Sequence, residues 1–203
     1  MAFPDRLIFC GLLTSLAWGD GNPGLLLEKL REMDVMHHWT AGVERIDWQS
    51  GDPDPKLPPR DKVGTHCSAF VASAGQRLGI YILRPPEHKP TFLASAQQEW
   101  LNSPEGRHEG WERVENAVAA RDRANEGQWV VASWRNPIPH KPGHIAIVLP
   151  SDWSDERVRL DGCEIMQAGR YNYLSTSLRQ GFANHRTAFE AGEIQFHAHS
   201  TDF

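Results

Sequence analysis

Apolar residues at helical spacing mark the first two thirds of the chain. The clearest helix is predicted over Cys67–Leu78, where apolar side chains recur every four positions from Phe70. Thr65 is suited to cap the start of this helix, and Gly79 is suited to end it. Three more helices are predicted, over residues 25–38, 91–101 and 113–125.

Strand-like segments come later in the chain and are short and rich in β-branched and aromatic residues. They cover residues 129–134, 144–149, 164–168 and 193–199. Helices that come first, with strands following in sequence and no regular strand–helix alternation, indicate an α+β domain with an antiparallel sheet. Residues 52–59 are polar and rich in proline, which fits neither a helix interior nor a central strand, so this stretch is predicted to be a loop.

The start of the chain allows two interpretations. Residues 7–13 form a short apolar run, and Ser15-Leu16-Ala17 offers small residues at the spacing of the cleavage site of an export signal. Asp5 beside Arg6 leaves little of the positive charge that such a signal carries. Residues 1–24 are therefore a candidate export signal or N-terminal extension, and the alternative is a buried first helix or strand.

Length and composition narrow the functional class. A chain of 203 residues fits a single domain that can bury a core without disulfides or structural metals. Lys and Arg number 21 against 26 Asp and Glu, a net charge of -5 without a basic run, which argues against a nucleic-acid partner. No apolar stretch reaches the roughly 20 residues of a membrane-spanning helix. The three cysteines are too few for a disulfide scaffold or a four-ligand zinc site, so an enzyme or a binding domain remains.

Cys67 is the first candidate for chemistry, because it lies in the first turn of the predicted helix. Unpaired N–H groups and the positive end of the helix dipole stabilise a thiolate there, which is the nucleophilic form of cysteine. A single cysteine is also a common structural core residue, so its position alone does not decide between the two roles.

Two polar residues on the predicted strands can complete a catalytic set. His144 opens an apolar strand directly after a Pro-Gly turn, where its ring could accept the thiol proton. Gln167 on the next strand could orient that ring through its amide. Taken singly, the first could equally be a surface residue and the second a satisfied polar residue of a sheet.

The order of these residues resembles the NlpC-type papain-like cysteine peptidases, which cut peptide bonds in bacterial peptidoglycan. That family shows Asp-Cys-Ser-Gly-Phe-Val at the nucleophile, where residues 66–71 read His-Cys-Ser-Ala-Phe-Val. Its Gly-Asp-Leu-Val strand matches 127–131, and its Gly-His-Val-Gly-Ile segment matches 143–147. Within the family, the chain is most similar to the amidase effectors of type VI secretion, which also share a cysteine, here Cys163, ahead of a Gln-Ala-Gly segment.

The resemblance spans residues 60–199 and implies a papain-like fold over that core. It implies a cysteine hydrolase of amide bonds in peptidoglycan peptide stems, with Cys67 as nucleophile, His144 as base and Gln167 as orienting residue. The alternatives are a cysteine acyltransferase or another amidase on this fold, and a non-catalytic wall-binding module. The expected setting is the cell envelope, periplasm or exterior, with a monomer, a peptide-stem substrate and an inhibitory or immunity protein as partners.

The chain departs from the family pattern at two positions. His66 replaces the aspartate before the nucleophile and is expected to affect the local pKa or the substrate-facing wall, and Gln167 stands where histidine, asparagine or a carbonyl is common. Substrate contacts are also expected from the loop after Gln167, at three residues: Tyr171, Asn172 and Tyr173. Cys163 is expected to be a structural thiol.

A metal or other cofactor is not expected. His197 and His199 have the period-two spacing that places two rings on one side of a strand. A structural or catalytic zinc site needs at least three protein ligands, and the sequence supplies no third ligand beside them.

Overall fold

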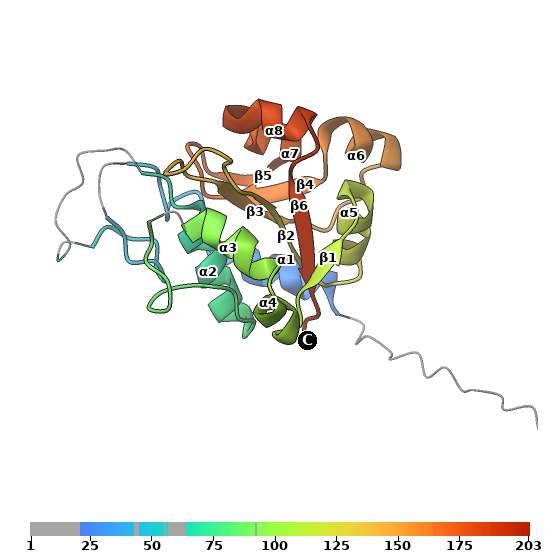
Figure 1. Ribbon diagram of the computed structural model, residues 1–203. Coiled ribbons are helices and arrows are strands. Elements are labelled where there is room, and N and C mark those ends of the chain that lie inside the picture. Colours follow the sequence, from blue (N-terminus) through green and yellow to red (C-terminus); the bar gives the residue numbers. More distant parts are fainter. Residues whose placement is uncertain (1–20, 43–44, 55, 57–63, 92) are drawn as a thin grey trace, which may run out of the picture.

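The computed structural model of the protein describes residues 21–42, 45–54, 56, 64–91 and 93–203 (Figure 1). The expected export signal or first element at 7–17 lies outside these residues, as does much of the proline-rich loop. Among the described helices, none is both long and apolar enough to cross a membrane.

The centre of the molecule is one antiparallel sheet of six strands in the order β1-β6-β2-β3-β4-β5. The α+β class with an antiparallel sheet is therefore confirmed. The strands are β1 (Glu112–Val114), β2 (Trp129–Trp134), β3 (His144–Val148), β4 (Glu164–Gln167), β5 (Tyr173–Ser177) and β6 (Gln195–His199).

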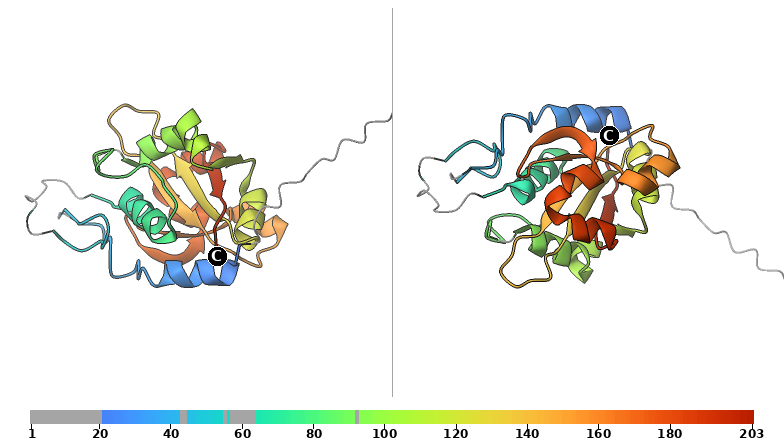
Figure 2. Two further views of the ribbon diagram at one scale, coloured as in Figure 1. Left: turned by 90° about the horizontal axis from the view of Figure 1, so that it is seen from below. Right: turned by 90° about the horizontal axis from the view of Figure 1, so that it is seen from above.

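Helices cover both faces of this sheet (Figure 2). One face carries α1 (Pro23–Arg31), α2 (Cys67–Leu78) and α3 (Leu93–Leu101). The other carries α5 (Ala117–Asn125), α6 (Asp155–Asp161), α7 (Leu178–Gly181), the 3-10 helix η1 (Ala183–His185) and α8 (Arg186–Glu190). The short helix α4 (Pro104–His108) connects α3 to β1. The expected packing of N-terminal helices on the sheet is thus present, together with a second helical layer that was not predicted from the sequence.

Strand alternation divides the core into two clusters. In β3, Ile145 and Ile147 face α1, α2 and α3, whereas Ala146 and Val148 face α5 and the C-terminal helices. Every residue of β2 and β3 is buried, because helices cover both sides of these central strands. This explains why their sequences read as continuous apolar runs rather than as an alternation.

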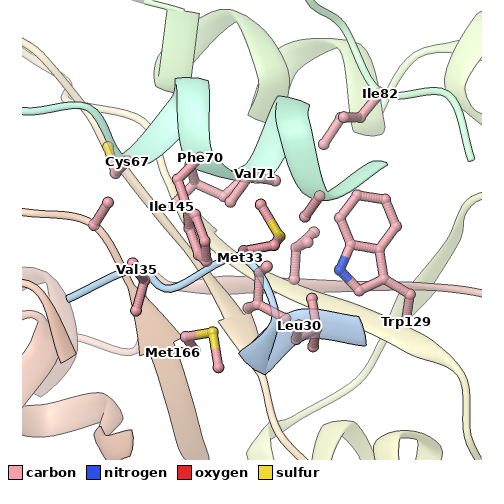
Figure 3. Packing of buried hydrophobic residues seen from close by; sticks show 14 of the residues in the cluster. Leu30, Met33, Val35, Cys67, Phe70, Val71, Ile82, Trp129, Ile145 and Met166 are labelled. Carbon is pink, nitrogen blue, oxygen red and sulfur yellow. The ribbon is translucent and has the colours of Figure 1, made fainter. Parts of the chain in front are cut away.

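Helix α2 has the predicted boundaries. Its residues from Cys67 to Gly75 are all buried, and Figure 3 shows Phe70 and Val71 directed toward Ile145 and Met33. Gly79 ends the helix with φ 73°, in the left-handed region that glycine adopts without strain. The predicted cap at Thr65 is wrong: the N-cap residue is His66, and its side chain makes no capping hydrogen bond.

Two other predicted helices have different boundaries. The helix at 25–38 ends at Arg31 and is followed by turns. The helix at 113–125 starts only at Ala117, because the Asn116 side chain accepts a hydrogen bond from the Ala119 N–H and caps it there. The residues before that cap form edge strand β1, which pairs with β6 at the end of the chain.

Candidate active site

Cys67 lies at the start of α2, where the helix approaches the first residues of β3 (Figure 3). Its side chain belongs to the core cluster on the α2 face and is 3 % exposed. Backbone N–H groups of Ile145, Ser68 and Cys67 itself are directed at the sulfur. The thiol therefore contacts the residue that follows His144 in β3.

The charge state of this thiol differs from the sequence expectation. Burial raises the pKa of Cys67, and the three N–H groups act in the opposite direction without reversing the shift. A position in the first helical turn was expected to favour the thiolate, but removal from water outweighs that effect. Cys67 is therefore a neutral thiol at rest, and it needs a base before it can attack.

His144 and Gln167 are joined by a buried hydrogen bond between neighbouring strands. The Nε2 atom of His144 lies 2.8 Å from Oε1 of Gln167. His144 is 6 % exposed and Gln167 is 2 % exposed. Burial lowers the pKa of His144, and the hydrogen bond to Gln167 opposes this shift. The ring is thus neutral near pH 7, as a base requires.

In a Ser-His-Asp triad, Nδ1–H of the histidine donates to the aspartate and Nε2 takes the proton of the serine. In His144 the two ring nitrogens have the opposite roles. Since a Gln Oε1 only accepts, Nε2 of His144 carries the hydrogen and Nδ1 keeps the lone pair. Nδ1 is consequently the ring nitrogen that can accept a proton. Nε2 is the bonded nitrogen because it is directed from β3 across to Gln167 on β4.

Two contacts fix the Gln167 amide in this orientation. Its Nε2 donates to the carbonyl of Tyr171 at 3.2 Å, which leaves Oε1 for the imidazole. Gly181 of α7 lies so close that a Cβ atom there would be 2.6 Å from Oε1 of Gln167. A side chain at Gly181 would therefore displace the amide from His144.

Two aromatic residues of the C-terminal helices also touch His144, and neither was predicted from the sequence. Phe182 packs edge-on against the ring, with centroids 4.6 Å apart. His185 lies 5.9 Å from the same ring and 4.6 Å from Trp134. Burial, together with the charge of His144, lowers the pKa of His185 to about 4, so this second imidazole is neutral near pH 7. No local pattern in the sequence connects residues 182–185 with a strand that starts 38 residues earlier.

Cys67 and His144 approach β3 from opposite faces and are not hydrogen-bonded. The His144 ring follows the alternation of β3 and lies on the face of α7, against Phe182. Cys67 approaches from the α2 face and meets the N–H of the next residue, Ile145. Within the part of the chain that the structure describes, no hydrogen bond joins the sulfur to the imidazole.

The expected substrate-contact residues have different surroundings. Tyr171 is 62 % exposed, beside the loop that touches the His144 ring, and Tyr173 opens strand β5. The side chain of Asn172 makes hydrogen bonds within the protein: it donates to the carbonyls of Val35 and His38 and accepts from the Gly169 N–H. It ties the loop after β4 to the segment after α1.

His66 and Cys163 complete the set of predicted residues. His66 directly precedes Cys67 as the N-cap of α2 and is 9 % exposed. Cys163 is fully buried in the other core cluster, and burial raises its pKa to about 12. These surroundings fit a structural thiol.

No group of three or more His, Cys, Asp or Glu side chains that could hold a metal ion occurs among the described residues. His199 uses both ring nitrogens on backbone carbonyls, those of Ser200 and Glu109. His197 is buried beside it on β6.

The structure thus joins His144 and Gln167 by a hydrogen bond and brings the Cys67 thiol to the same strand from the opposite face of the sheet. Comparison with known proteins assigns no family to this arrangement, since no family model matches the chain and no curated protein does.

Proposed function

We propose that the chain is a papain-like cysteine hydrolase that cleaves amide bonds in the peptide stems of bacterial peptidoglycan. The observation that carries the proposal is the buried hydrogen bond between His144 and Gln167, at the strand start that also receives the Cys67 thiol. A neutral amide holding a neutral imidazole beside a cysteine at a helix N-terminus suits acyl transfer through sulfur. The peptide-stem substrate rests on the resemblance of the motifs around these residues.

The reaction starts from a neutral thiol and a neutral ring. Nδ1 of His144 takes the Cys67 proton as the sulfur attacks the amide carbonyl carbon. The sulfur and the His144 ring approach β3 from opposite faces, so this step requires a rearrangement that brings Nδ1 to the sulfur. The Cys67 N–H at the start of α2, with a neighbouring donor, holds the oxyanion.

The second half of the reaction releases the products. The tetrahedral intermediate collapses, the carbon–nitrogen bond breaks and His144 returns its proton to the leaving amine. Water, deprotonated by the same ring, then hydrolyses the thioester and regenerates the free thiol. Gln167 accepts from Nε2–H throughout, which keeps the lone pair on Nδ1.

Digestion of purified sacculi tests the proposal. The protein is incubated with sacculi, and released peptides are identified by mass spectrometry, which also assigns the bond that is cut. Cys67→Ala and His144→Ala should each reduce release by at least about 1,000-fold, and the double variant should lose little more, because the two groups act as a unit. Cys163→Ala is the matched control, since it removes a buried thiol elsewhere and should leave release nearly unchanged.

Three outcomes would contradict the proposal. Near-normal release by either Cys67→Ala or His144→Ala removes the catalytic assignment. Binding to sacculi without release of fragments favours the wall-binding module. Fragments joined to an added amine rather than to water favour the acyltransferase. Circular dichroism of each variant shows whether a loss reflects chemistry rather than unfolding.

A further inference from the structure

A cavity with charged and apolar walls lies at the β1–β6 edge of the sheet, away from Cys67. It has a volume of about 320 Å³ and is lined by residues of α3, α4, β1 and β6, including Arg107, Arg113 and His197. Figure 1 shows α4 and β1 next to each other at this edge, near the C terminus. The volume is at the lower end for small-molecule sites.

His197 is the buried polar group of this cavity. Its side chain is 1 % exposed, and neither ring nitrogen has a hydrogen-bond partner among the described residues. Burial, followed by the charge of Arg113, lowers the pKa of His197 to about 4, so the ring is neutral near pH 7. A neutral imidazole offers one donor and one acceptor, and burying both unpaired costs free energy that a ligand would recover.

Two arginines bring positive charge to the same cavity. Arg113 is the register partner of His197 across β1 and β6, so the two side chains lie on one face. Its Nη1 is 3.5 Å from Oδ1 of Asn102, and Arg107 Nη1 donates to the Asn102 carbonyl at 2.8 Å. In the described part of the chain, neither arginine forms an ion pair.

The only carboxylate among the lining residues does not neutralise this charge. Glu112 alternates with Arg113 in β1 and shares the face of Val114, which belongs to the opposite core cluster. Its carboxylate lies 4.0 Å from the guanidinium of Arg123 in α5. The cavity therefore combines two arginines and a neutral imidazole, with Leu101 and Trp111 as buried apolar walls.

We propose that this cavity binds a small organic carboxylate. The Arg113 and Arg107 guanidinium groups supply the positive charge, and the His197 N–H donates to a carboxylate oxygen. The carbon part of the ligand packs against Leu101 and Trp111, which favours an organic anion over inorganic phosphate.

This site is separate from the candidate active site. His197 pairs with Val131, which pairs with Ile147, three residues along β3 from His144. With about 3.3 Å per residue and about 4.8 Å per strand, the two histidine backbones are about 14 Å apart. The proposal does not depend on the hydrolase function.

Titration of the full chain with butyrate, followed by NMR of the imidazole nitrogens and the Trp indole N–H groups, tests the site. Saturable shifts should appear at His197 and Trp111. Arg113→Gln should weaken butyrate binding at least tenfold, and His197→Gln should weaken it several-fold. Arg186→Gln, which removes an exposed arginine of α8 paired with Glu190, is the control and should leave binding unchanged.

The contrary results are equally specific. No saturation by 100 mM butyrate, or equal affinity in wild type and Arg113→Gln, would overturn the site. Inorganic phosphate bound as tightly as butyrate would show a general anion site and overturn the assignment to organic carboxylates. Unchanged butyrate binding in Cys67→Ala is expected, because the two sites share no side chain.

Discussion

At the scale of single residues, burial controls the candidate chemistry. It raises the pKa of the Cys67 thiol and lowers the pKa of the His144 imidazole, so both groups are neutral before reaction. A pair of this kind forms its charges only as the proton moves. The partner of Nε2 and the N–H groups at the sulfur then decide how readily those charges develop.

The two described cysteines should differ in reactivity. Burial raises the pKa of Cys163 to about 12, so at pH 8 only about one molecule in 10⁴ carries its thiolate. Cys67 has three N–H groups that oppose the effect of burial. We expect iodoacetamide to alkylate Cys67 at least about tenfold faster, as measured by peptide mapping that also resolves Cys10. Faster labelling of Cys163 than of Cys67 would contradict the assignment of Cys67 as the nucleophile. It would also show that iodoacetamide does not reach the Cys67 thiol more readily than the Cys163 thiol.

The Gln167 amide should affect rate through orientation alone. Gln167→Ala removes the acceptor for Nε2–H, and we expect turnover to fall by roughly 10- to 1,000-fold, clearly less than in Cys67→Ala. Gln180→Ala is the control, because Gln180 is a nearby exposed amide that contacts only the Tyr173 hydroxyl with its side chain among the described residues. Wild-type turnover in Gln167→Ala would remove the orienting role.

A carboxylate at the same position should move the pH dependence. In Gln167→Glu the negative charge stabilises the imidazolium and raises the pKa of His144. The reaction needs the neutral ring, so the acid limb of the pH–rate profile should shift to higher pH by about one unit or more. If the acid limb of the profile does not shift, a group other than His144 controls that limb.

At the scale of elements, α2 determines where the sulfur lies. The first nine residues of the helix are buried. No side-chain hydrogen bond caps its start, and Gly79 ends it in the left-handed conformation. Because α2 packs directly on β3, a shift of the helix would move the sulfur relative to Ile145 and His144.

The end of α2 offers a test of this element. Gly79 has φ 73°, and no atom lies within 4 Å of the position that a Cβ would take, so Gly79→Ala adds backbone strain without a clash. We expect it to lower the free energy of unfolding by about 1–2 kcal/mol in urea titration. Gly79→Asn should cost less, since asparagine tolerates this conformation. Gly42→Ala is the matched control, with open space and no positive φ, and an equal loss there would contradict the explanation.

At the scale of the whole molecule, buried histidines link stability to pH. Burial lowers the pKa of both His185 and His197 to about 4, compared with about 6.5 in the unfolded chain. Between these values the unfolded state binds more protons than the folded state, so stability is complete above pH 6.5 and falls as pH decreases toward 4.

We expect the free energy of unfolding to decline from pH 7 to pH 5, a range in which few carboxylates titrate. His197→Gln should flatten this decline, because it removes one of the histidines whose pKa is lowered by burial. His108→Gln, at an exposed position of α4, should leave the slope unchanged. A slope that His197→Gln does not alter would show that other groups carry the pH dependence.

Local patterns in the sequence determined the elements that bear the candidate site. The four-residue apolar spacing and Gly79 fixed α2 to the residue, and apolar runs located β2 and β3. These features depend on neighbours within one turn or one strand, so the chain encodes them locally. They made Cys67, His144 and Gln167 candidates, and the resemblance of the surrounding motifs joined the three into one set.

Tertiary structure decided the rest, because it concerns residues far apart in the chain. Strand β1 is a strand only because β6, more than 80 residues later, pairs with it. The pKa of Cys67 is raised because the thiol is buried against β3. Nε2 of His144 is the bonded nitrogen because β4, which carries Gln167, lies beside β3. Burial, register and the approach of Phe182 and His185 to His144 arise only when the strands and both helical layers pack together.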